Sequence, residues 1–231
     1  MKMKVVQCWD DGIVNDIRLT EMLRKYGAKA TFNLNTGTMG DTRGKNEWMG
    51  HDYRGWSYHG FCSGKLALKD IAEVYDGFEV ASHCRCHENA GDMPDEEWIK
   101  RALDARHALE DIVQRDCRGF AWPCGRYTAG TIRLLRENGF AYGRTTENTY
   151  DVTSNKEPLA LATNCHYQAF DFWERFERAR PTGVFYFWGH SYEMYEYDGL
   201  WDSLEDKIRT ISEDPDCEWA NVIDIVPLLG K

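Results

Sequence analysis

The sequence predicts an α/β fold built from successive strand–helix units. Short apolar runs alternate with stretches in which apolar residues recur at helical spacing, a pattern typical of βα units. No repeat, low-complexity segment or linker interrupts residues 1–231, and a chain of this length can bury one sizeable core. We therefore expect a single domain over residues 1–231.

The first predicted strand covers residues 5–9, which are mostly apolar. A helix is predicted over residues 16–26, where apolar residues recur at helical spacing and Gly27 follows as a helix-ending residue. Strands over 28–34 and 78–82 and a short helix over 68–75 complete the first half of the chain.

Pro94 and Asp95 open the clearest helix, predicted over residues 95–114, because both residue types suit a first helical turn. The remaining predicted elements are, in order, strand 117–122, helix 131–138, strand 140–145, helix 171–179, strand 183–188, helix 204–211 and strand 219–225.

Residues 36–66 break this rhythm, because they lack helical or strand periodicity. They carry aromatic and histidine side chains among glycines: Trp48, His51, Tyr53, Trp56, Tyr58, His59 and Phe61. A loop this long inside a compact domain is usually functional or disordered. Its aromatic content weighs against disorder, so we expect a lid or wall over a site.

Composition and charge exclude several classes of partner. The net charge of −10 and the lack of any basic run argue against nucleic acid and against an anionic membrane surface. The N-terminal residues carry no apolar leader, so a cytoplasmic protein with reduced cysteines is expected, or an exported one if a leader is removed. The oligomeric state is left open. An aromatic content of 13% fits either a large core or a ligand surface made of flat rings.

Two adjacent carboxylates follow the first predicted strand, in Cys8-Trp9-Asp10-Asp11-Gly12. Like charges this close repel each other, and burial raises their pKa unless a cation compensates. A divalent ion could bind one carboxylate and leave its neighbour ionised as a base. An exposed Asp-Asp-Gly turn is the alternative.

His83 and His87 follow the third predicted strand, four positions apart. In a helical turn both imidazoles would lie on one side and could bind one ion together with Asp11. Two His and one Asp leave open coordination positions, as a catalytic site requires. A closed zinc site that uses Cys84 and Cys86 is the competing interpretation. His190, which follows the predicted strand 183–188, is a third candidate, because α/β barrels gather active residues at the C-terminal ends of strands.

Together these segments resemble the NodB-type polysaccharide deacetylases of carbohydrate esterase family four, over most of the chain. The family motif T-F-D-D-G is similar to residues 8–12, H-[ST]-x-x-H to residues 83–87, and R-x-P-x-G to Ala121-Trp122-Pro123-Cys124-Gly125. The resemblance implies a distorted (β/α) barrel of seven or eight strands. It also implies that Asp10 is the general base, that Asp11, His83 and His87 are metal ligands, and that His190 is the general acid.

The sequence departs from the family at Ala121, where an arginine that steadies the base is usual. We expect Arg144, on the next predicted strand, to reach Asp10 from the side, with Arg126 as the other candidate. The motif D-x-x-D-W is also absent, and Glu147 or Asp151 is expected to orient His190 in its place. His166 is expected to be structural or to touch substrate.

The resemblance implies a metal-dependent hydrolase that removes acetyl groups, most often N-acetyl, from a carbohydrate. Zinc suits the donor set, and cobalt, nickel or iron would fit it too. A backbone N–H near Tyr127 would stabilise the oxyanion, and Trp122, Pro123 and Trp188 are expected to bind or support the substrate. The alternatives are a cyclic amide or imide hydrolase, an O-acetyl esterase acting on xylan-like chains, and an inactive sugar-binding relative.

Overall fold

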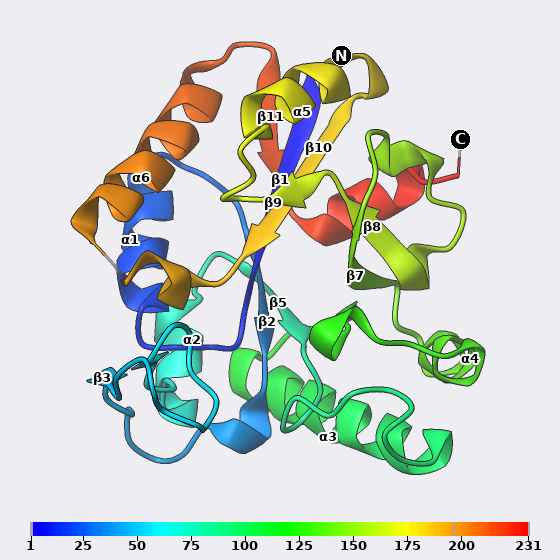
Figure 1. The fold of residues 1–231 in the computed structure, drawn as a ribbon. Helices are drawn as coiled ribbons and strands as arrows, with labels where there is room; N and C mark the ends of the chain where they lie inside the picture. The colour runs from blue at the N-terminus through cyan, green and yellow to red at the C-terminus, as the bar shows by residue number, and fades with distance from the viewer. Residues whose placement is uncertain (1, 196, 231) are drawn as a thin grey trace.

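The centre of the computed structural model, which describes residues 2–195 and 197–230, is a parallel sheet that curls into a nearly closed barrel (Figure 1). Its eight strands are hydrogen-bonded in the order β8-β7-β6-β5-β2-β1-β10-β9. Their bounds are β8 Leu161–Thr163, β7 Tyr142–Asn148, β6 Gly119–Ala121, β5 Glu79–Ser82, β2 Thr31–Leu34, β1 Met3–Asp10, β10 Val184–Gly189 and β9 Cys165–His166. The predicted distorted (β/α) barrel is confirmed.

Strand β1 is the central strand of this barrel. It pairs with β10 from Lys4 to Trp9 and with β2 from Cys8 to Asp10. A ninth strand, β11 (Cys217–Ala220), pairs with the first half of β1. Because these strands are all parallel, their C-terminal ends meet at one rim, where β1 delivers Asp10, β5 ends before His83 and β10 ends before His190.

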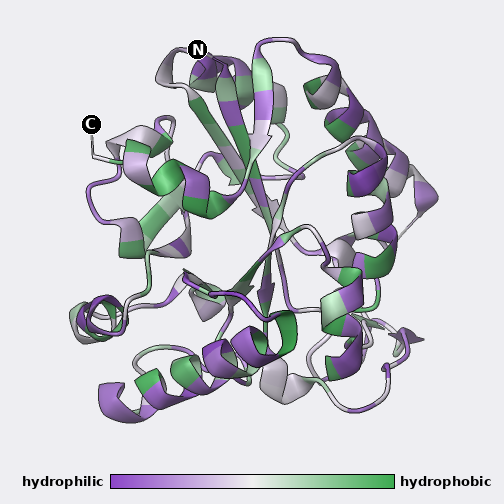
Figure 2. Ribbon diagram, turned by 180° about the vertical axis from the view of Figure 1, so that it is seen from behind, coloured by the Kyte–Doolittle hydropathy of each residue, from purple (hydrophilic) through white to green (hydrophobic). Residues whose placement is uncertain are grey.

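In the described part of the chain, six α-helices surround the barrel (Figure 1). They are α1 Asp16–Lys25, α2 Ile71–Val74, α3 Asp95–Val113, α4 Ala129–Glu137, α5 Phe172–Ala179 and α6 Asp198–Glu213. Apolar and polar residues alternate along them (Figure 2), as expected of helices that bury one side against a sheet. Among the residues the structure describes, no helix combines the length and apolarity needed to cross a bilayer.

The longest helix, α3, forms where the sequence predicts it. Pro94 precedes it, and three acidic residues in its first turn complement the positive end of the helix dipole. Its buried residues are Trp98, Ile99, Ala102, Ala105 and Leu109. The helix ends at Val113, and the capping residue Gln114 adopts a left-handed conformation (φ 53°).

Two of the predicted elements need correction, and two strands were missed. The predicted strand 219–225 is the end of β11 followed by a 3₁₀ helix, Val222–Leu228, whose start is capped by an Asn221 N–H bond to the Asp224 carboxylate (3.0 Å). The predicted helix 204–211 begins six residues earlier, as α6. Strands β8 and β9 were not predicted, because segments of three and two residues are too short to show a period.

The long segment 36–66 contains a small antiparallel hairpin of β3 (Glu47–Trp48) and β4 (Phe61–Cys62). Lys65, at its end, forms an isolated bridge with Ile13 just after β1. The segment is therefore tied to the rim at which the barrel strands end.

A group of stacked aromatic rings joins α3 to the barrel below this rim. Trp98 is fully buried and lies parallel to Trp122 (centroids 5.2 Å apart, planes at 14°), with Phe120 packed edge-on against both. The Trp98 indole N–H also donates to the Glu88 carbonyl (3.0 Å). This packing holds the end of β6 in place.

Trp98→Ala is therefore expected to lower the free energy of unfolding by about 3–5 kcal/mol, because it removes a large buried ring and leaves a cavity. Urea unfolding monitored by circular dichroism measures the change. Trp173→Ala is the matched control, since that ring is 40% exposed on α5 and should cost far less. Equal effects of the two substitutions would contradict this account of the core.

Candidate active site

A cavity of about 570 Å³ opens at the rim where the barrel strands end. Eight of the ten residues predicted for the site line it: Asp10, Asp11, His83, His87, Trp122, Arg144, Trp188 and His190. The segment 36–66 contributes Thr38, Trp56 and Lys65 to its wall. The sequence motifs, far apart along the chain, thus meet around one space.

Pro123 and Tyr127, the other two predicted residues, are not among those that line the cavity. Pro123 is buried in the 3₁₀ turn Pro123–Gly125, and the Tyr127 hydroxyl donates to Glu147 (3.3 Å). Trp122 is also a core residue, since its indole N–H donates to the Leu159 carbonyl (2.7 Å). The supporting role expected of Pro123 and the oxyanion contact expected of a backbone N–H near Tyr127 stay predictions.

Asp11, His83 and His87 bring one carboxylate oxygen and two imidazole nitrogens within 4.8 Å of one another. The two histidines do not lie on a helical turn, contrary to the sequence prediction. Cys84 (φ 60°) and His87 (φ 63°) instead adopt left-handed backbone conformations in a bend after β5. Asp11 is likewise left-handed (φ 84°). Non-glycine residues rarely adopt this conformation, and strained positions of this kind cluster at functional sites.

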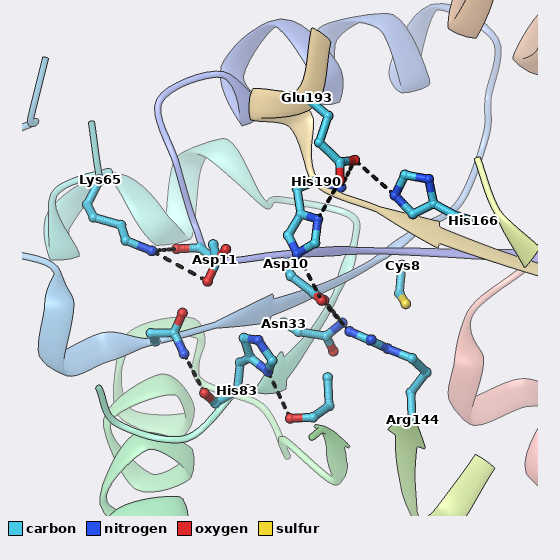
Figure 3. Close-up of polar contacts among 12 residues, drawn as sticks. Cys8, Asp10, Asp11, Asn33, Lys65, His83, Arg144, His166, His190 and Glu193 are labelled. Carbon is cyan, nitrogen blue, oxygen red and sulfur yellow. Dashed lines mark hydrogen bonds and ion pairs between the residues drawn. The ribbon is translucent and has the colours of Figure 1, made fainter. Parts of the chain in front are cut away.

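The hydrogen bonds of His83 leave one ring nitrogen available for a ligand bond. Its Nδ1 lies 2.8 Å from the Ala121 carbonyl, which can only accept, so Nδ1 carries the proton and Nε2 keeps its lone pair (Figure 3). Burial lowers the pKa of His83 to about 4, which keeps the ring neutral at pH 7. A metal-binding histidine commonly has this tautomer and this type of partner.

The donor set fits a divalent metal. Two imidazoles and one carboxylate on a cavity wall match the ligands of catalytic zinc sites. Lys65 lies beside Asp11, with its ammonium 3.6 Å from the carboxylate and 2.8 Å from the backbone carbonyl. Within residues 2–195 and 197–230 no metal-binding group includes a cysteine: Cys84 is buried and Cys86 is exposed. The alternative of a closed site with these cysteines is therefore not supported.

Asp10 is held by an ion pair that is buried on both sides. The Arg144 guanidinium donates to Oδ2 of Asp10, and the Asn33 amide donates to Oδ1 (2.7 Å) (Figure 3). Burial alone would raise the pKa of Asp10, but Arg144, with His83 and His190 nearby, holds it well below its usual range. Arg126 pairs with Asp92 instead (2.8 Å), so Arg144 is the arginine that reaches Asp10, as the sequence predicts.

The neighbouring strands explain how Arg144 can stand in for an arginine at position 121. Ala121 on β6 and Arg144 on β7 are register partners, so the two positions lie side by side at the same height in the sheet. A long side chain from position 144 can therefore enter the space that the small Ala121 leaves open.

His190 is oriented by Glu193, which the sequence predictions missed. Its Nδ1 lies 3.1 Å from Glu193 Oε1, and its Nε2 points toward Asp10 (3.7 Å) (Figure 3). Glu193 Oε2 also lies 3.0 Å from His166 Nε2 and accepts the His190 backbone N–H (3.0 Å). The sequence feature that could have identified Glu193 is its position three residues after His190, within one turn of a 3₁₀ helix.

These contacts set the protonation of His190. Burial would lower its pKa, but the hydrogen bond and the negative charge of Glu193, together with Asp10 and Asp11, raise it to about 9. The same contacts hold the pKa of Glu193 at about 2 against the effect of burial. Glu147 bonds to Tyr127 and Asp151 caps the turn at Thr153 (2.9 Å), so neither takes the expected place beside His190.

Comparisons with known proteins bear on this arrangement. A family model described as polysaccharide deacetylase matches residues 1–143. No curated protein matches the chain.

Several solved structures share the fold. One is the Xyl-CE4 domain of a multidomain xylanase from the hindgut metagenome of Trinervitermes trinervoides (13% identity, TM-score 0.60, covering 98% of this chain and 91% of that one). Another is a family 4 acetyl xylan esterase from Clostridium thermocellum in complex with cobalt (15%, 0.58, 97% and 91%). A third is a CE4 family pseudoenzyme from Bacillus anthracis (13%, 0.59, 97% and 66%). At these identities the similarity shows the fold alone.

The chain spans only part of some of these relatives. It covers 55% of a deacetylase from Streptococcus pyogenes and 66% of the Bacillus anthracis protein. The activities of those whole proteins are therefore not transferred to this chain by similarity.

Arg144→Met is expected to lower the free energy of unfolding of the metal-free protein at pH 7 by about 3–5 kcal/mol, since it leaves a buried carboxylate unpaired. The pKa of Asp10 is lowered in the wild type and should be raised by burial in the variant. The loss in free energy of unfolding is thus largest at pH 7, and it shrinks as the pH falls and Asp10 becomes protonated. Urea unfolding at several pH values measures it.

The control for this prediction is the double substitution Arg144→Met with Asp10→Asn, which removes both charges. It should recover most of the lost stability. A deficit that does not depend on pH, or no recovery in the double variant, would rule out the ion pair as its cause.

Glu193→Gln is expected to lower the pKa of His190 from about 9, because burial then acts without the compensating carboxylate. NMR titration of the histidine ring signals in metal-free protein measures the change. Asp151→Asn serves as the control, since that carboxylate caps a turn elsewhere. An unchanged pKa of His190 in Glu193→Gln would show that Glu193 does not control its protonation.

Proposed function

The chain belongs to the polysaccharide deacetylase family, and from that premise we propose that it is a metal-dependent hydrolase that removes acetyl groups, most often N-acetyl, from a poly- or oligosaccharide. One observation carries the proposal. The Asp11, His83 and His87 donors, the paired carboxylate of Asp10 and the imidazole of His190 line the same cavity.

Asp11, His83 and His87 would hold the ion, with zinc the best match to the donors and cobalt, nickel or iron able to replace it. When bound there, such an ion would polarise the acetyl carbonyl and make a water molecule acidic enough to be deprotonated near neutral pH. All three residues line the cavity, where the acetyl group would lie.

Asp10 acts as the general base in this proposal. Its pairing with Arg144 and Asn33 keeps the carboxylate ionised and fixed in direction, so it is ready to accept a proton from the attacking water. The same pairing makes Asp10 a weak base, which is why the acidity of the water must be increased. Arg144 is thus a positioning residue that acts through Asp10.

His190 acts as the general acid. The Nδ1–H of His190 donates to the Glu193 carboxylate, so Nε2 faces Asp10 and the cavity. A pKa of about 9 keeps His190 protonated at neutral pH. An amine leaves a tetrahedral centre only after it gains a proton, whereas an alcohol demands less of the acid. A His190 that is protonated at neutral pH therefore favours an N-acetyl substrate over an O-acetyl one.

An O-acetyl esterase is the second candidate, because the same residues would perform that reaction and a structural relative is named an acetyl xylan esterase. A cyclic amide hydrolase and an inactive sugar-binding protein remain alternatives. The buried Arg144–Asp10 pair weighs against the inactive form, since it restores the contact that Ala121 removes.

The test is acetate release from fragments of chitin, peptidoglycan and acetylated xylan, with and without a chelator, beside ammonia or acid release from cyclic amides. We expect acetate release that stops on chelation and returns with zinc. Activity that persists in chelator would contradict the proposed mechanism.

Asp10→Asn is expected to lower kcat by about 10²–10⁴-fold while the protein still binds its metal, because it removes the proton acceptor and leaves the ligands. Asp206→Asn, an exposed position on α6, is the matched control. A metal-loaded Asp10→Asn protein with wild-type kcat would show that Asp10 is not the base.

A further inference from the structure

Residues 44–64 form a small lobe, here called the flap, that projects from the barrel rim on a narrow neck. At the neck the Gly44 N–H donates to the Lys65 carbonyl (2.8 Å), and the backbones of Gly44 and Gly64 touch. A Cβ on Gly64 would lie 2.4 Å from the Gly44 carbonyl carbon, so the neck closes only with glycine there. Asn46, just beyond the neck, donates to the Asn15 side chain (2.9 Å).

Aromatic rings fasten the flap to the segment that follows His190. Phe61 stacks on Tyr195 with centroids 4.4 Å apart and planes at 2°. Tyr58 packs on Tyr192 at 5.4 Å. These contacts join the flap to the 3₁₀ helix Ser191–Met194, which also carries Glu193. The flap is therefore positioned by the same element that orients the candidate general acid.

Trp56 stands where the flap meets the cavity. It lines the cavity and is still 66% exposed. Its ring meets Tyr192 nearly at a right angle (5.4 Å, 85°), and Tyr192 in turn stacks on His190 (4.8 Å, 24°). The indole is thus held one ring away from the proposed proton donor, with most of its surface open to solvent.

This exposure is costly unless a ligand covers it. Each Å² of apolar surface left in water forgoes about 25 cal/mol, and the flap also exposes Trp48 and Tyr53. Exposed apolar surface that is continuous with a cavity marks a ligand site. A sugar ring can stack on a tryptophan, because the C–H bonds of the sugar present a weakly positive face to the negative π face of the indole.

We propose that Trp56 is a stacking platform for a sugar unit adjacent to the one that loses its acetyl group, so that the substrate is an oligosaccharide rather than a monosaccharide or a small cyclic amide. This inference rests on the proposed function, because it places the reacting acetyl group at Asp11, His83 and His87. A small cyclic compound bound beside those three residues would cover less of the Trp56 ring, which is 66% exposed, than a chain of sugars would.

The test is calorimetric binding to the zinc-loaded protein of two ligand pairs: N-acetylglucosamine with its β-1,4-linked pentamer, and acetylated xylose with acetylated xylopentaose. We expect at least one pentamer to bind tighter than its monomer. Trp56→Ala should lower the affinity for that pentamer about tenfold, consistent with the loss of one stacking contact. Trp56→Phe should recover part of the lost affinity.

Phe170→Ala is the matched control, because Phe170 is fully exposed and does not line the cavity. The platform is overturned if neither pentamer outbinds its monomer, or if Trp56→Ala weakens monomer and pentamer equally. It is also overturned if Trp56→Ala changes only self-association in sedimentation, which would make the flap a contact between two copies.

Binding and acetate release are measured separately, so the two proposals can fail separately. Trp56-dependent pentamer binding without acetate release would contradict the proposed hydrolase activity and support the proposed role of Trp56. Acetate release without tighter binding of the pentamers would contradict the role of Trp56 and support the hydrolase activity.

Discussion

The buried ion pair between Arg144 and Asp10 is the constraint on which the site depends. Two charges removed from water cost several kcal/mol each unless they pair with each other, so the loss of either residue alone destabilises the fold. The pair can form only if β1 and β7, which lie on different sides of the barrel, deliver their side chains to one interior point. Closure of the barrel and ionisation of Asp10 are therefore coupled, and Asn33 on β2 completes the set of donors to Asp10.

The two adjacent carboxylates at the end of β1 point in different directions, because the backbone turns between them. Asp10 points into the barrel toward Arg144, whereas Asp11, in a left-handed conformation, turns toward His83 and His87. Arg144 beside Asp10 and Lys65 beside Asp11 relieve the repulsion between the neighbouring charges. His190 likewise has its own carboxylate in Glu193, which holds the imidazole protonated.

The sequence predicted the parts of this arrangement that depend on local pattern. The apolar runs placed β1, β5 and β10, and with them the residues at their C-terminal ends. Arg144 was found because adjacent strands of a parallel sheet bring equivalent positions together, here Ala121 and Arg144. Glu193 was missed because one carboxylate in a four-residue 3₁₀ helix carries no periodic signal beyond its three-residue spacing from His190. The helical turn expected for His83 and His87 was wrong, because i, i+4 spacing alone does not distinguish a helix from a bend with left-handed residues.

The central claim is that Asp11, His83 and His87 bind one divalent ion, and metal stoichiometry tests it most directly. The protein is saturated with zinc, dialysed, and its metal content measured for the wild type, for His83→Ala with His87→Ala, and for His166→Ala. We expect one zinc per chain in the wild type and in His166→Ala, and none in the double variant. Zinc retained in the double variant but lost in His166→Ala would contradict the claim and move the ion to the group of His166, His190 and Glu193.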